Sequence, residues 1–110
     1  MGWNVRTDIT QEEFDRYVAV VIDYVKERKG WNPREYRIRF ITALADAPLV
    51  AVNVIHYDGV KDLKANPPRG FGVHPLEMQV YVHTEKMRAF EGVEEYHQIR
   101  NQARERNAGK

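Results

Sequence analysis

The chain has 110 residues, no cysteine and a net charge of +1, with 43% hydrophobic and 30% charged residues. This length fits one domain, and the composition excludes a wholly disordered chain, a disulfide scaffold and a strongly basic, histone-like protein. We expect a single α+β domain over residues 1–100 and a frayed, charged tail over residues 101–110. Because no apolar run is long enough to span a bilayer, we also expect a cytoplasmic protein with no membrane contact.

Residues 11–29 are predicted to form a helix. Thr10 and Glu13 have the spacing of a capping box, and Gly30 is a typical stop signal. Between them, apolar residues recur at helical intervals and cover roughly half of the helix circumference. An arc that wide exceeds what one sheet needs, so we expect this helix to contact a second element, such as a partner subunit.

Two strands, over residues 36–44 and 49–57, are predicted to form an antiparallel hairpin. Their alternation favours a register in which Phe40 lies opposite Val54, so that both apolar sets share one face. A third strand over residues 76–83 alternates in the same way and adds Val80 to that face.

The remaining chain is predicted to hold a long Gly- and Pro-rich loop over residues 59–75 and a last helix opened by Thr84 and Glu85. A short edge strand over residues 3–6 is also expected. The element order is therefore (β)-α-β-β-β-α. The simplest packing is a two-layer sandwich, an antiparallel sheet with both helices on one face.

The opposite sheet face is the first candidate for function, because it combines basic and aromatic side chains. Such a face suits single-stranded nucleic acid, since bases stack on rings and cations follow phosphates. Two other interpretations stay open: a solvated face with ion pairs such as Arg39 to Glu77, or burial against a partner subunit.

The loop over residues 59–75 is the second candidate, because its lysines and its Arg-Gly-Phe-Gly run could hold an anion; the alternative is a packed surface loop. Together, the two candidates give this set of ligand-binding residues: Arg37, Arg39, Tyr57, Lys61, Lys64, Arg69 and Tyr81.

Histidine and carboxylate side chains near the strand ends suggest an alternative, a divalent metal ion held by His56, Asp58 and Glu77. Asp58 followed by Glu77-Met78-Gln79 on a later strand resembles the core of restriction-endonuclease-like nucleases, which implies a metal that activates water. Gln79 stands where that family has a lysine, and the strand that follows its helix is missing. The chain contains neither serine nor cysteine, which excludes serine and cysteine hydrolases.

The sequence therefore favours a non-enzymatic binding module for an anionic ligand, most simply nucleic acid, without a cofactor and with a homo-oligomeric state. Two alternatives remain at this point. One is a metal-dependent hydrolase or nuclease, and the other is an architectural or partner-regulating homodimer.

Overall fold

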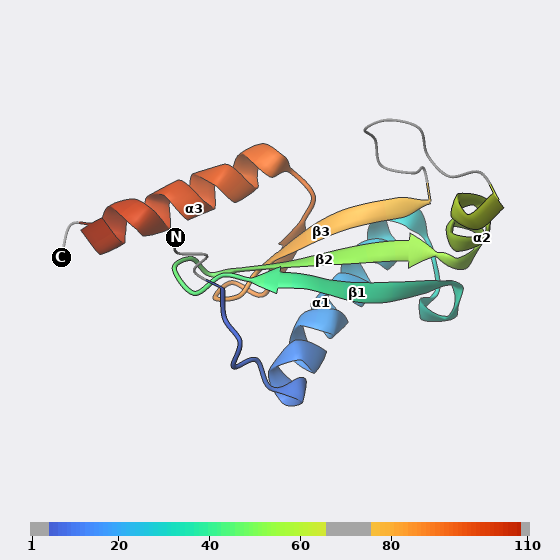
Figure 1. Ribbon diagram of the computed structural model, residues 1–110, viewed down its shortest axis with the longest axis horizontal. Helices are drawn as coiled ribbons and strands as arrows, with labels where there is room; N and C mark the ends of the chain where they lie inside the picture. The colour runs from blue at the N-terminus through green and yellow to red at the C-terminus, as the bar shows by residue number, and fades with distance from the viewer. Residues whose placement is uncertain (1–4, 66–75, 109–110) are drawn as a thin grey trace.

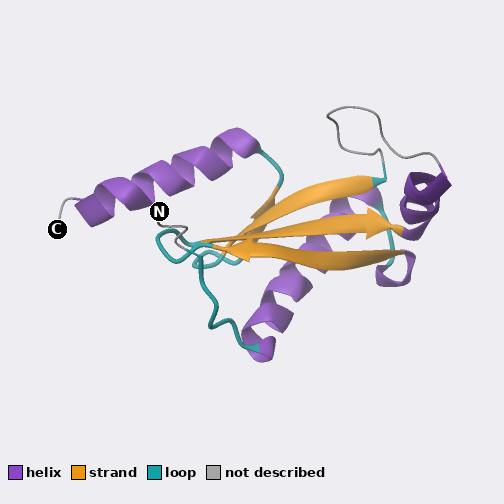
Figure 2. Cartoon of the chain, in the orientation of Figure 1, coloured by secondary structure: helices purple, strands orange, loops and turns teal. Residues whose placement is uncertain are grey.

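A computed structural model describes residues 5–65 and 76–108. These residues form a four-stranded antiparallel sheet in the order β1-β2-β3-β4, together with helices (Figures 1 and 2), which confirms the predicted α+β class. In chain order the elements are α1 (Gln11–Lys29), the 3-10 turn η1 (Pro33–Glu35), β1 (Tyr36–Ala43), β2 (Leu49–His56), α2 (Tyr57–Ala65), β3 (Glu77–His83), β4 (Arg88–Phe90) and α3 (Val93–Ala108).

Helix α1 begins and ends where the sequence predicts. The Thr10 hydroxyl accepts a hydrogen bond from the Glu13 amide at 3.0 Å. At the other end Gly30 has a φ of +72°, and its amide donates to the Lys26 carbonyl. Glycine suits this left-handed position because it has no Cβ to clash with the backbone.

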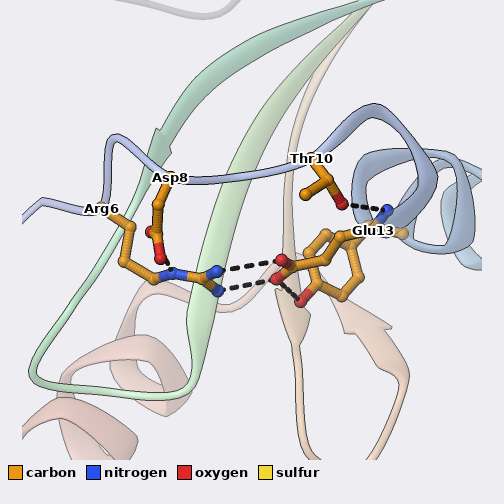
Figure 3. A network of polar contacts seen from close by, with 5 residues as sticks. Arg6, Asp8, Thr10 and Glu13 are labelled. Carbon is orange, nitrogen blue, oxygen red and sulfur yellow. Dashed lines mark hydrogen bonds and ion pairs between the residues drawn. The ribbon is translucent and has the colours of Figure 1, made fainter.

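The Glu13 side chain does not close the predicted capping box but joins a network with the N-terminal segment (Figure 3). Arg6 donates two hydrogen bonds to the Glu13 carboxylate, at 2.7 and 2.9 Å, and a third to Asp8 at 3.1 Å. Tyr17 donates its hydroxyl to the same carboxylate. These bonds, those from Arg6 first, lower the pKa of Glu13 to about 2. The network thus fastens the segment before α1 to the helix.

The edge strand expected over residues 3–6 appears only as one bridge between Val5 and Leu44, next to a bond from the Arg6 amide to the Ala43 carbonyl. Residues 1–4 lie outside the described residues.

The main core lies between α1 and one face of the sheet. Tyr17, Val21 and Val25 of α1 are buried against the apolar residues of the strands. The strands pair Val50 with Val82, Val52 with Val80, and Val54 with Met78. The prediction that these residues share the core face is therefore confirmed.

The predicted register between β1 and β2 is wrong, by two residues as far as Phe40 and by one residue from Thr42 onward. Phe40 lies opposite Val52 rather than Val54, and an irregularity follows between Phe40 and Thr42. An extra residue in one strand shifts its alternation, so Ala43, and neither Thr42 nor Leu44, reaches the core cluster. Hydrophobic alternation could not show this, because Thr42, Ala43 and Leu44 can each occupy a buried position.

Two elements in the second half differ from the prediction. Residues 57–65 form α2, where the sequence predicts the end of a strand at Tyr57 and a loop from Gly59; residues 66–75 lie outside the described part of the chain. Residues 88–90, expected in the last helix, form β4 after a turn in which Met87 has a φ of +50°. Helix α3 starts at Val93 and continues to Ala108. Residues 101–108, for which the sequence predicts a frayed tail, thus belong to this helix.

Helix α1 occupies the predicted face, whereas α3 packs against the other one. Ala103, Tyr96 and Ile99 of α3 belong to a second cluster with side chains from that face and from the hairpin loop: Ala47, Leu49, Ala51, Tyr81 and Phe90. Figure 1 shows α3 running out beyond the hairpin end of the sheet, with α2 at the opposite end. This arrangement leaves part of the second face without a helix.

Candidate anion-binding surface

The second face of the sheet is divided into two halves. The covered half, at the hairpin end, consists of Leu49, Ala51, Tyr81 and Phe90, which are buried in the cluster with α3. Toward α2 the register places two rows of three side chains on the same face. These rows, Arg37–Ile55–Glu77 and Arg39–Asn53–Gln79, form the open half.

Arg37 and Arg39 give one edge of the open half its positive charge. Both are exposed residues of β1, separated by Ile38, which points to the core. Neither forms an ion pair or hydrogen bond within the part of the chain that the structure describes. The cross-strand pair of Arg39 with Glu77 is thus not formed, and both guanidinium groups are available to an external anion.

Helix α2 brings a third cation to this edge. Lys64 and Val60, one turn apart, line a shallow pocket of about 270 Å³ together with Arg37, Arg39 and Ile55. Among the described residues, the lining of the pocket combines aliphatic side chains with three cations and contains no acidic side chain. A pocket of this volume can hold one base or one phosphate group, but not a complete oligonucleotide.

Tyr57 and Lys61 lie on the same helix, outside the pocket lining. Tyr57 is 47% exposed at the start of α2, and Lys61 is exposed one turn later. Spacings of four and seven residues place Tyr57, Lys61 and Lys64 along one side of the helix. The predicted residues of α2 and β1 are therefore neighbours at the end of the sheet.

The opposite edge of the open half is acidic and fixed. The Asn53 side chain donates from Nδ2 to Glu77 Oε1 at 2.6 Å. Asn53 Oδ1 is buried and has no hydrogen-bond partner among the described residues. Because Asn53 lies on β2, between β1 and β3, this bond holds the Glu77 carboxylate against the sheet.

Tyr81, predicted as a ligand-binding residue, is buried between other aromatic side chains. It is 6% exposed, stacks on Tyr96 with ring centroids 4.6 Å apart, and contacts Phe90 at 5.4 Å. The prediction that this ring is exposed on the open sheet face is therefore wrong, because α3 and β4 cover it. Arg69 lies outside the described residues.

The alternative metal site is not assembled by the fold. His56 Nδ1 lies 3.7 Å from Asp58 Oδ2 and accepts a bond from the Asp58 amide, and the His56 ring packs against Trp31 on the core side. Glu77 lies on the other face of the sheet. Within residues 5–65 and 76–108, no three histidine or acidic side chains are grouped to hold a metal ion.

The sequence does not single out Val60 as a site residue, because residues 59–75 are predicted to form a loop. The spacing of Val60 and Lys64 is a helical signal, but Gly59 conceals it. A nine-residue helix that includes a glycine is a weak pattern without its packing partners.

Comparisons with family models, with curated proteins and with solved structures give no match to this chain. None of the described helices is both long and apolar enough to cross a bilayer. Function is therefore inferred from the chemistry of the surface itself.

Proposed function

We propose that the protein is a non-enzymatic binding module that holds single-stranded nucleic acid on the open half of the sheet. One observation carries this proposal: Arg37, Arg39 and Lys64 surround one pocket, and neither arginine has a partner in the described chain. Surface arginines without an acidic neighbour are strong candidates for phosphate contacts, because the guanidinium group bonds two oxygens at once.

The apolar part of the same pocket favours a nucleic acid over a small inorganic anion. Ile55 and Val60 offer an apolar surface for the face of a base while the cations contact the backbone. Tyr57 supplies an exposed ring nearby. An exposed sheet that combines these groups is a common platform for single strands.

Self-association is a second candidate role, favoured by a separate observation. Val5, Phe40 and Ile41 are 41%, 40% and 47% exposed near the outer edge of β1. Exposed apolar residues beside an edge strand favour contact with another chain. Sedimentation velocity tests this role, which predicts a dimer that Phe40→Glu dissociates; a monomer at all concentrations would contradict it.

Nucleic-acid binding can be measured by fluorescence anisotropy with a labelled single-stranded DNA dodecamer of mixed sequence. Three phosphate contacts predict that affinity falls roughly twentyfold between 50 and 200 mM salt. An affinity that does not change with salt would contradict a contact made by cations.

A matched pair of variants tests the location. Arg37→Ala/Arg39→Ala should abolish measurable binding, since it removes two of the three cations of the pocket. Arg16→Ala/Arg104→Ala removes the same charge from exposed positions on α1 and α3 and should bind like the wild type. If the first variant binds normally, or if both variants lose affinity equally, the open half is not the binding site.

A further inference from the structure

The charge of the open half changes from positive on β1 to negative on β3. The register places Arg37, Ile55 and Glu77 in one row across β1, β2 and β3. Adjacent strands lie about 4.8 Å apart, so the backbones of β1 and β3 are about 10 Å apart. The row therefore presents a cation, an aliphatic side chain and a carboxylate, spaced about as far apart as the phosphate and base of one nucleotide.

The Glu77 carboxylate has one oxygen engaged and one available. Oε1 accepts the bond from Asn53, and no hydrogen bond to Oε2 is formed within the described residues. The side chain is half-buried, and the Asn53 bond restrains its rotation. Oε2 is thus a fixed acceptor at the rim of the surface.

The two edges impose a direction on an anionic ligand. Phosphates are attracted to the Arg37 and Arg39 edge and repelled by Glu77. A nucleotide whose phosphate lies on β1 and whose base crosses Ile55 therefore points the edge of the base at Glu77. If the protein binds nucleic acid as proposed, the Glu77 carboxylate therefore contacts the base of the nucleotide rather than its sugar-phosphate backbone.

We propose that Glu77 makes the surface selective for bases that carry an exocyclic amino group. The inference rests on the proposed function and adds base preference to it. A carboxylate accepts a hydrogen bond from the N4 amino group of cytosine. Uracil has a carbonyl oxygen at that position, and its N3–H is flanked by two carbonyl oxygens that a carboxylate repels.

Two decamers test this preference, because deoxycytidine and deoxyuridine differ in the base only at the C4 and N3 positions. At pH 7.5 and 100 mM salt, the wild type should bind the deoxycytidine decamer roughly three- to tenfold more tightly, as expected for one hydrogen bond gained. Glu77→Gln keeps an oxygen for Asn53 and adds a donor, so the ratio should fall to about one.

Glu27→Gln is the matched control, because it removes the same charge from an exposed position on α1 and should keep the wild-type ratio. Unfolding curves of both variants show whether the fold is retained. A preference that persists in Glu77→Gln would overturn the role of this residue.

The two proposals fail in distinguishable ways. Equal affinity of the wild type for both decamers, with binding still lost in Arg37→Ala/Arg39→Ala, would overturn the base preference and leave the proposed function standing. Failure of the wild type to bind either decamer at low salt would overturn both.

Discussion

The covered half and the open half lie on the same face of one sheet, yet their side chains differ in size and charge. The covered half holds Leu49, Ala51 and Tyr81, whose uncharged side chains are buried in one cluster with α3. The open half holds Arg37 and Arg39, whose long charged side chains cannot be buried without partners. Alternation along a strand thus determines on which face of the sheet a side chain lies. The size and charge of the side chains on that face determine whether a helix can pack over it.

Small residues explain how α3 reaches the covered half. Ala103 of α3 is 4% exposed and belongs to one cluster with Ala47 of the hairpin loop and Ala51 of β2. Short side chains let a helix backbone approach, and the stacked rings of Tyr81 and Tyr96 fill the remaining space. No such small residue lies in either row of the open half.

The largest expected effect is on stability and belongs to the covered half. Tyr81→Ala should lower the free energy of unfolding by about 3 kcal/mol, because it removes a buried ring and leaves a cavity beneath α3. Urea unfolding measures this change. A loss under about 1 kcal/mol would mean that α3 packs loosely and that the two halves differ less than described.

A smaller expected effect is on the pH dependence of the free energy of unfolding. It belongs to the covered half, next to which a buried histidine lies. His83 lies opposite Leu49, is 7% exposed, and accepts a bond at Nδ1 from the Lys86 amide at 3.2 Å. Burial first, and then the nearby charges of Lys86 and Arg88, lower the pKa of His83, against an opposing effect of Glu85.

Because the pKa of His83 is 6.5 in the unfolded chain and lower in the folded one, the unfolded state binds more protons as the pH falls through 6.5. The free energy of unfolding should therefore decrease below about pH 6.5 and recover above it. Urea unfolding at pH 7.5 and 5.0 should show a smaller pH dependence in His83→Gln than in the wild type. His97→Gln, an exposed control on α3, should keep the wild-type dependence.

The smallest expected effect on stability belongs to the open half. Arg37→Ala/Arg39→Ala should change the free energy of unfolding by no more than about 0.5 kcal/mol, because neither side chain has a partner in the described chain. Thermal and urea unfolding would both detect a larger loss. Such a loss would indicate that these arginines serve the fold and would remove the contrast between the halves.

Elements fixed by local chemistry could be predicted from the sequence. Thr10 caps the start of α1 with its side chain, and Gly30 ends the helix in a left-handed conformation. Both effects act within a few residues along the chain. The division of β2 and β3 into core and opposite faces follows from alternation alone. The placement of Arg37 and Arg39 on the second face was found in the same way.

Elements that depend on distant contacts were not predictable. Phe90, Val93 and Tyr96 have helical spacing, but pairing of Phe90 with Tyr81 makes residues 88–90 a strand. Tyr81 has the alternation of an open position, and it is buried because Tyr96 of α3 and Phe90 of β4 pack against it. The pocket likewise needs α2, whose nine residues resemble a loop when read alone.

The most direct test of the account is a nuclear magnetic resonance titration of the labelled protein with a single-stranded deoxycytidine decamer. If the open half binds the decamer, chemical-shift changes should be confined to Arg37, Arg39, Ile55, Glu77 and the residues of α2. The amides of Tyr81, Phe90 and Ala103 should not move. Shifts centred on α3 or on the hairpin end, or none at saturating decamer, would contradict the assignment of binding to the open half.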